Sequence, residues 1–277
     1  MSQPIVQSLW IGARLSVMEQ LSIRSFLKHG HPFHLYTYGA VRDVPKGAVV
    51  RSGDEILPER EIFRYEADGY GKGSVAAFAN FFRYKLLLER GGWWTDLDSV
   101  CIRPLDFAEE HVLGYEREPD GRRQVAVGLI KAPIGSPLMG YCWQRCQQTD
   151  RARLVWGETG PRLMAEAIER VRVPVRLLEP AAFYPIDYWQ IWQLIRERQM
   201  PERCYSIHLW NSMWRRERLD PDAVYDLESV YEQLKRRFGV ASPVGADYGP
   251  GWLSIGKLRL RQFKSGLRKT RPVLRAA

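Results

Sequence analysis

The feature that most constrains the fold is the order of strand, helix and strand at the start of the chain. Residues 5–11 and 33–38 each have the apolar pattern of a short strand. Between them, Ser16 and Glu19 have the spacing of a capping box at the start of a helix that ends near Gly30. Two strands joined by a helix begin a sheet with parallel strands covered by helices. We therefore expect an α/β protein.

The rest of the chain continues this alternation. The clearest helix is expected at 75–89, followed by two glycines and a short aromatic strand at 93–95, whereas 42–74 is expected to be loop with a short helix. Further strands are expected at 125–131, 173–178 and 205–210, and further helices at 138–147, 161–171 and 227–238. No repeat of 20 to 50 residues is visible, which excludes solenoids and propellers.

Length and composition exclude several classes of protein. The sequence has 277 residues, 45% apolar and 26% charged, which is typical of a folded domain. No apolar run approaches the roughly 18 residues of a membrane-spanning helix, and the first residues lack the pattern of a secretory signal. The four cysteines are scattered, so no disulfide scaffold is expected. We expect a cytoplasmic protein.

The net charge of +9 is concentrated at the end of the chain. Residues 257–277 hold eight basic residues and no acidic one, and residues 1–256 hold 33 basic and 32 acidic residues. Apolar residues interleave with the basic ones in this tail. It is either an amphipathic helix that lies on an anionic membrane surface or a disordered solubilising tail. The domain is therefore expected to span 1–256, with the tail outside it.

Two carboxylates, Asp96 and Asp98, directly follow the aromatic strand at 93–95. In an extended chain, residues i and i+2 project to the same side, so both carboxylates can face one cation. Such a pair suits Mg²⁺ or Mn²⁺ completed by substrate phosphates, although many Asp-x-Asp pairs are solvated turn residues. Arg83, on the preceding helix, can bind a diphosphate or a ribose beside the metal, or else be an ordinary surface arginine.

The segment that contains these residues has a longer pattern. It consists of Ala76, Asn80, Arg83, Leu87, Gly91, Gly92, Trp94, Asp96 and Asp98. This pattern resembles the sugar-binding region of glycosyltransferase family 32. That Asp-x-Asp class includes yeast mannosyltransferases and α-1,4-galactosyl- and N-acetylglucosaminyltransferases, and it is related to the clostridial glucosylating toxins. The family usually has Asp at the position of Asn80 and Tyr at that of Trp94, which leaves the identity of the sugar open.

Three other stretches resemble the same family in the expected order. Residues 9–12 are similar to the toxin segment whose tryptophan stacks on uracil, and 159–161 are similar to a motif on the acceptor side. Residues 207–211 resemble the late His-x-Trp segment of the α-1,4-transferases, which returns to the metal and the diphosphate.

The resemblance implies a fold and a set of roles. The fold would be of GT-A type, with a Rossmann-like central mixed sheet flanked by helices, a nucleotide-sugar half at about 1–105 and an acceptor half at about 106–256. The expected metal ligands are Asp96, Asp98 and His208. The expected catalytic contacts to the sugar or diphosphate are Asp96, Trp210 and Asn211. The expected donor-binding residues are Leu9, Trp10, Ile11, Gly12, Asn80, Arg83, Asp96 and Leu97.

The expected activity follows from the same resemblance. It is a metal-dependent, retaining transfer of a hexose or N-acetylhexosamine from a UDP-sugar, with Mn²⁺ or Mg²⁺, to a saccharide or glycolipid. Because we expect a cytoplasmic protein, we expect this acceptor to be a lipid-linked glycan in bacterial surface polysaccharide biosynthesis. The enzyme would be cytoplasmic or peripheral on the inner face of the membrane.

Two other functions remain open. Asp96 and Asp98 superficially resemble the nucleophile loop of haloacid-dehalogenase-like phosphatases, but that loop lies near the N-terminus in those enzymes. A non-catalytic basic module that binds nucleic acid or membranes is the other alternative. Because no helix-turn-helix, zinc-finger or RNP pattern is visible, we expect no nucleic-acid partner.

Overall fold

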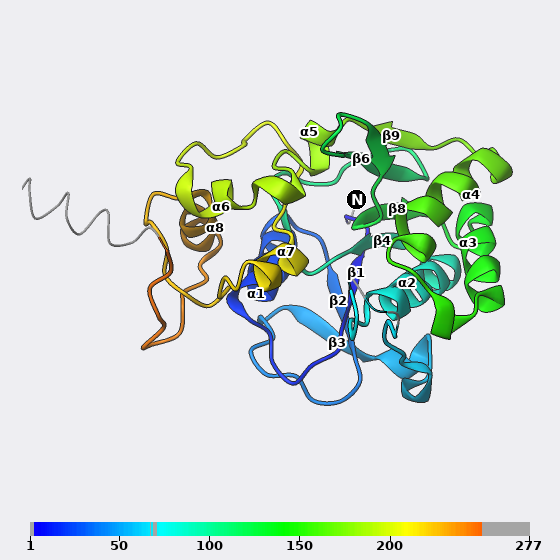
Figure 1. Cartoon of the computed structure of the whole chain (residues 1–277), viewed down its shortest axis with the longest axis horizontal. Helices are drawn as coiled ribbons and strands as arrows, with labels where there is room; N and C mark the ends of the chain where they lie inside the picture. The colour runs from blue at the N-terminus through cyan, green and yellow to red at the C-terminus, as the bar shows by residue number, and fades with distance from the viewer. Residues whose placement is uncertain (1–2, 67, 69–70, 251–277) are drawn as a thin grey trace, which may run out of the picture.

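The computed structural model describes residues 3–66, 68 and 71–250 of the chain. A mixed sheet of eight strands lies at its centre, in the order β3-β2-β1-β4-β8-β6-β7, with β9 beside β6 (Figure 1). The strands are β1 Val6–Trp10, β2 Phe33–Thr37, β3 Ala48–Ser52, β4 Gly92–Thr95, β6 Val112–Arg117, β7 Arg123–Val125, β8 Leu129–Ala132 and β9 Arg176–Leu178. The first four are parallel, and β8 is antiparallel to both β4 and β6. The α/β fold expected from the sequence is confirmed.

A second, two-stranded sheet lies beside the first. It pairs β5 (Ser99–Cys101) antiparallel with β10 (Ser206–His208). This pairing joins the segment that follows β4 to a segment far along the chain.

Helices occupy much of the remaining described chain. They are α1 Val17–Lys28, α2 Ala76–Arg90, α3 Pro137–Gln148, α4 Leu163–Val171, α5 Pro180–Phe183, α6 Trp192–Arg196, α7 Asn211–Arg216 and α8 Val230–Phe238. Short 3₁₀ turns lie at Gly53–Glu55, Glu59–Glu61, Arg151–Arg153 and Tyr188–Gln190, and a π turn at Glu158–Arg162 precedes α4. The capping box predicted for α1 is present, with Ser16 as the N-cap residue.

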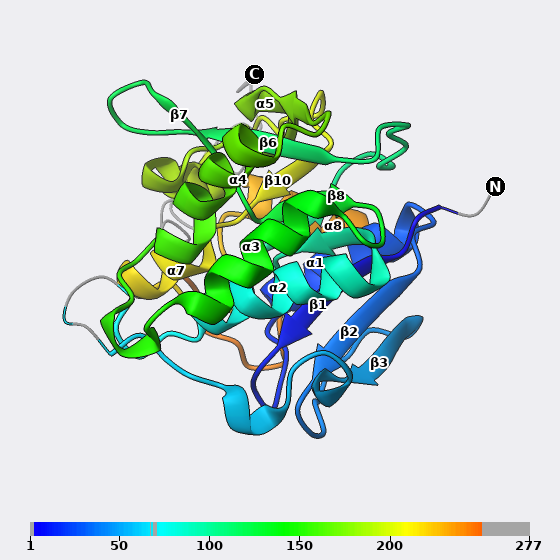
Figure 2. The same ribbon diagram turned by 90° about the vertical axis from the view of Figure 1, so that its right-hand side faces the viewer.

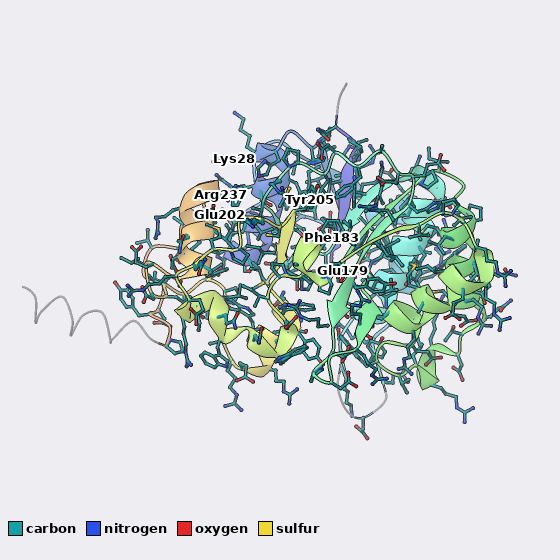
Figure 3. All side chains as sticks on the ribbon, turned by 90° about the horizontal axis from the view of Figure 1, so that it is seen from above. Lys28, Glu179, Phe183, Glu202, Tyr205 and Arg237 are labelled. Atoms are coloured by element: carbon teal, nitrogen blue, oxygen red, sulfur yellow. The ribbon has the colours of Figure 1, made fainter. Side chains whose placement is uncertain are left out.

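The sheet separates two apolar cores because successive side chains of a strand face opposite sides. Trp93 belongs to the core that includes α1 and α8, whereas Trp94 belongs to the core that includes α2, α3 and α4. Figure 2 shows α2 and α3 on the near side of the sheet. On the far side, Lys28 at the end of α1 donates a hydrogen bond to the carbonyl oxygen of Arg237 in α8 at 2.6 Å (Figure 3). Both faces of the sheet are therefore covered by helices.

Two segments differ from the sequence-based prediction. Residues 42–74 contain the edge strand β3, whose Val49 and Val50 are 48% and 51% exposed. A strand that buries so little apolar surface has a weak sequence pattern. The single strand predicted at 125–131 is divided between β7 and β8, and β6 was not predicted.

Some predictions concern the membrane and the end of the chain. Among the described residues, no helix combines the length and apolar character needed to cross a membrane. The basic tail at 257–277 lies outside the described residues. The division into a nucleotide-sugar half and an acceptor half stays a prediction.

Candidate active site

A cleft of about 770 Å³ opens at the carboxyl ends of β1 and β4. In α/β sheets, ligands bind at this edge, where loops and helix ends surround the strands. Most of the predicted site residues line it, namely Leu9, Trp10, Asn80, Arg83, Asp96, Leu97, Asp98, His208, Trp210 and Asn211. The fold therefore brings together segments that are distant in the sequence.

Ile11 and Gly12 are not among the residues that line the cleft. Ile11 packs against the core on the side of α2. A Cβ atom on Gly12 would lie 3.0 Å from the indole Nε1 of Trp10, so the glycine leaves room for that ring. Among the described residues, the buried Nε1 of Trp10 has no hydrogen-bond partner.

Asp96 and Asp98 lie in a turn between β4 and β5. The backbone N–H of Ser99 donates to the carbonyl oxygen of Asp96 at 3.0 Å, which closes the turn. The prediction that an extended chain orients the two carboxylates is therefore wrong. The turn performs this role, because it curls Asp98 back toward the same side as Asp96.

Arg83 holds the carboxylate of Asp96. Its Nη2 lies 2.6 Å from Asp96 Oδ1, and its Nη1 donates to Oδ1 of Asn80 at 2.9 Å. The Arg83 side chain is 4% exposed and lies over the ring of Trp94, whose indole N–H also donates to Asp96 Oδ1 at 2.8 Å. Burial raises the pKa of Asp96, Arg83 acts against this shift, and the nearby Asp98 adds to it. Arg83 is a buried partner of Asp96, so the surface-arginine alternative is wrong.

Asp98 is bound from the other side of the cleft. Its Oδ1 lies 3.2 Å from Nε2 of His208, and its Oδ2 accepts the backbone N–H of Asn211 at 2.8 Å. The pairing of β5 with β10 places His208 opposite Ser99, the residue after Asp98. Burial alone would raise the pKa of Asp98, but His208 and the N–H of Asn211 outweigh it and hold this pKa below its usual range.

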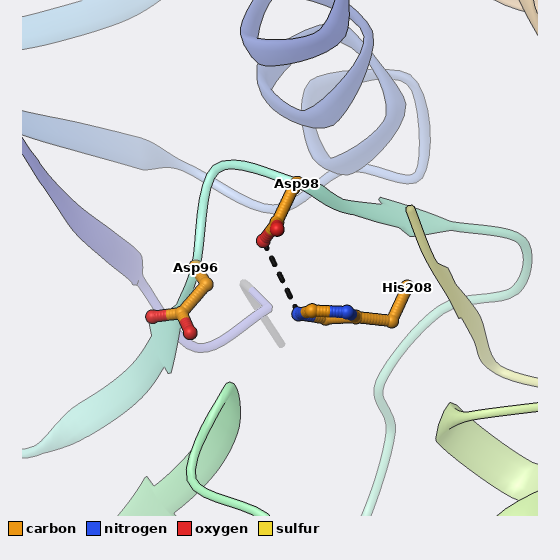
Figure 4. A group of neighbouring side chains, drawn as sticks. All are labelled: Asp96, Asp98 and His208. Atoms are coloured by element: carbon orange, nitrogen blue, oxygen red, sulfur yellow. Dashed lines mark ion pairs between the residues drawn. The ribbon is translucent and has the colours of Figure 1, made fainter. Parts of the chain in front are cut away.

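The residues around this point fit a divalent cation. One ligand atom each from Asp96, Asp98 and His208 lies within 4.8 Å of the others (Figure 4). A Cβ atom on Gly128 would lie 3.3 Å from both Asp96 Oδ2 and His208 Nε2, so the absence of a side chain there keeps this space open. Two carboxylates and one imidazole are ligands that Mn²⁺ accepts, and Mg²⁺ prefers the carboxylates.

Trp210 and Asn211 occupy the start of α7. Trp210 has a φ of 60°, which is uncommon for a residue other than glycine. Its indole N–H donates to the carbonyl oxygen of Ile186 at 2.8 Å, and its ring lies 4.1 Å from that of His208. The indole N–H is thus used within the protein, and Trp210 presents only its ring to the cleft. The side-chain amide of Asn211 donates to Oε1 of Glu19 at 3.2 Å.

One family of known proteins matches part of the chain. Residues 132–238 match the family model described as the alpha 1,4-glycosyltransferase conserved region. This chain is similar to alpha 1,4-glycosyltransferases. The match confirms the resemblance predicted from the sequence, and its range includes residues 159–161 and 207–211. The turn with Asp96 and Asp98 lies outside the matched range.

Solved structures give more distant similarities to this glycosyltransferase-like chain. A structure titled "PaToxG Glycosyltransferase" is 12% identical, with 86% of each chain covered and a TM-score of 0.43. Another, the structure of a transferase mutant, is 9% identical, with 61% of this chain and 85% of that chain covered and a TM-score of 0.41. No curated protein matches the sequence.

The cleft of the glycosyltransferase-like chain also contains residues that the sequence did not reveal. They include Glu19, Glu116, Glu118, Gln124, Gly128 and Tyr184. Glu19 was recognised only as part of a capping box, and its second contact depends on tertiary structure. Glu116 and Gln124 lie on strands without a clear apolar alternation, so no local signal marked them.

Proposed function

We propose that the chain transfers a hexose or N-acetylhexosamine from a UDP-sugar to a saccharide or lipid-linked glycan, with retention of configuration. The observation that carries this proposal is the cluster of Asp96, Asp98 and His208 in a cleft beside a buried arginine. The similarity of residues 132–238 to alpha 1,4-glycosyltransferases supports the reaction class.

In this proposal, Asp96, Asp98 and His208 hold Mn²⁺ or Mg²⁺, which supplies positive charge opposite the leaving diphosphate. Arg83 fixes the orientation of Asp96 and compensates part of its charge. Leu9 and Trp10 lie at the end of β1 and line the cleft. We place the uridine beside them because residues 9–12 resemble the toxin segment whose tryptophan stacks on uracil.

The transfer exchanges one bond at the anomeric carbon for another. The bond between the anomeric carbon and the diphosphate oxygen breaks, and the diphosphate leaves with the bonding electrons. The acceptor hydroxyl oxygen bonds to the anomeric carbon, and its proton passes to the departing diphosphate. Asn80 borders the donor sugar, and its amide contacts Oγ1 of Thr159 at 3.4 Å in the segment that resembles an acceptor-side motif.

A panel of UDP-sugars tests this proposal. We expect the purified protein to release UDP from at least one of them with Mn²⁺, and not after chelation of the metal. Asp98→Ala should lower the rate at least about 100-fold, because even residues that only support metal ligands are worth 10- to 100-fold. Glu109→Ala, which removes a carboxylate outside the cleft, is the matched control. A panel with neither binding nor turnover would contradict the proposal.

The acceptor and the location of the enzyme are a further part of the proposal. We propose that the acceptor is a lipid-linked glycan at the inner face of the cytoplasmic membrane, with residues 257–277 as the contact to anionic lipid. Sedimentation with anionic vesicles, comparing the full chain with a chain that ends at Gly256, tests the contact. Equal binding of the two proteins would refute it.

A further inference from the structure

One face of the hairpin formed by β6 and β7 carries polar side chains into the cleft. Glu116 pairs with Gln124 across the two strands, and the amide of Gln124 donates to Glu116 Oε1 at 2.6 Å. Glu118, two residues further along, accepts the hydroxyl of Tyr188 at 3.1 Å. All four residues line the same cleft as the proposed metal site.

The arginines of this hairpin do not compensate the two glutamates. Arg117 is paired with Asp187 at 2.9 Å, and Arg123 is paired with Glu179. In the described part of the chain, neither Glu116 nor Glu118 forms an ion pair with a basic residue. The hairpin therefore gives this end of the cleft, its acidic end, two carboxyl groups that no basic residue of the hairpin neutralises, and their oxygen atoms can accept hydrogen bonds.

The buried carboxyl group of Glu116 makes this part of the cleft unfavourable for a further negative charge. Its side chain is buried, and burial raises its pKa to about 7, although His208 and Gln124 act against the shift. A second anion beside this buried carboxyl group could bind only if Glu116 took up a proton, because burial already disfavours negative charge here. A hydroxyl group would instead donate a hydrogen bond to the carboxyl oxygen that Gln124 leaves unused, and an ammonium group would favour the ionised form of Glu116.

These residues are separate from those of the proposed donor site. Strand β8 lies between β4, which leads to Asp96, and β6, which carries Glu116. A Cβ atom on Gly128, just before β8, would lie 3.3 Å from Asp96 Oδ2 and 3.4 Å from the hydroxyl of Tyr184. Asp96 and His208 also influence the pKa of Glu116. The acidic end of the cleft thus lies beside the point where the sugar would be transferred.

We propose that Glu116, Glu118 and Gln124 form the acceptor subsite, and that they select a saccharide that presents hydrogen-bond donors and carries no anionic group. This inference rests on the proposed function. Glu118 discriminates between saccharides by their charge. It is less buried than Glu116, so its carboxyl group is more accessible to a bound saccharide.

Three methyl hexosides that share one ring provide the probes: the neutral galactoside, the amino-substituted galactosaminide and the anionic galacturonide. Their binding to the full-length protein is measured by saturation-transfer NMR with UDP and Mn²⁺ present. Their use as acceptors is measured with the UDP-sugar that the panel described above identifies as a donor. We expect the galacturonide to be at least about tenfold poorer than the other two. Glu118→Lys should abolish or reverse this preference, whereas Glu109→Lys, outside the cleft, should leave it unchanged.

The outcomes separate this inference from the proposed function. Release of UDP without an acceptor measures the donor site alone. If that reaction occurs but no probe binds, or the galacturonide is used as well as the galactoside, the acceptor subsite is refuted and the donor function stands. If Glu118→Lys keeps the original preference, the subsite is also refuted. Selective binding without any UDP release would refute the proposed transfer and, with it, the role of these residues as an acceptor subsite.

Discussion

The imidazole Nε2 of His208 lies 3.2 Å from the carboxylate Oδ1 of Asp98, although the two residues are far apart in the sequence. The contact depends on the antiparallel pairing of β5 with β10. The next segment of the chain adds a second contact, because the N–H of Asn211 donates to Asp98 Oδ2. One short sheet therefore assembles the proposed metal site.

Replacing Arg83 by Met should destabilise the protein by about 2 kcal/mol, because it leaves Asp96 without its cation. This figure is below that of a fully buried pair since the Asp96 side chain is 33% exposed. Urea denaturation measures the change. Arg145→Met, which removes an exposed arginine with only a 3.9 Å contact, should cost less than about 0.5 kcal/mol. Equal effects of the two substitutions would contradict the role of Arg83.

Gly128→Ala should weaken Mn²⁺ binding about tenfold or more with little loss of stability. The added methyl group would lie 3.3 Å from Asp96 Oδ2 and His208 Nε2, in the space proposed for the ion. Calorimetric titration with Mn²⁺ in the presence of UDP measures the affinity. The control is Gly140→Ala in α3, where the new Cβ would meet only a side-chain atom of Leu88 at 3.7 Å. Unchanged affinity in Gly128→Ala would place the ion elsewhere.

Ser16→Ala and Glu19→Ala should have similar effects on stability but different effects on activity. Each removes one half of the capping box of α1, which costs about 1 kcal/mol. Only Glu19 also accepts the amide of Asn211, whose backbone N–H holds Asp98. Turnover of the UDP-sugar should therefore fall about tenfold further in Glu19→Ala. Parallel losses in both variants would show that Glu19 only caps the helix.

The free energy of unfolding should depend on pH through Glu116. Its pKa in the folded protein is about 7, above the ordinary value of 4.5. Between these values the folded protein binds more protons than the unfolded chain, so stability falls as the pH rises through this window. Glu116→Gln should remove up to about 3 kcal/mol of this dependence. Urea denaturation at pH 5 and pH 8 tests it, with Glu109→Gln as control. A variant that loses stability as steeply as the wild type would contradict the shift.

Part of the site was predictable because it is encoded locally. The carboxylates of Asp96 and Asp98 are two residues apart, and Arg83 lies on a strongly apolar helix that leads directly to them. Their grouping needs only one helix and one strand. The reason for their orientation was not predictable, because the closing hydrogen bond of the turn is not visible in the residue pattern.

The sequence by itself determined the elements whose signals are contained in one segment: β1, α1 with its capping box, β2, α2 and β4. Their periodicity and end residues specify them without distant contacts. Only the tertiary structure decided that His208 meets Asp98, that Glu19 meets Asn211, and that the acidic face of the β6–β7 hairpin borders the same cleft. These contacts depend on which strands and helices pair across long separations, and a local pattern of apolar residues does not record the choice of partner.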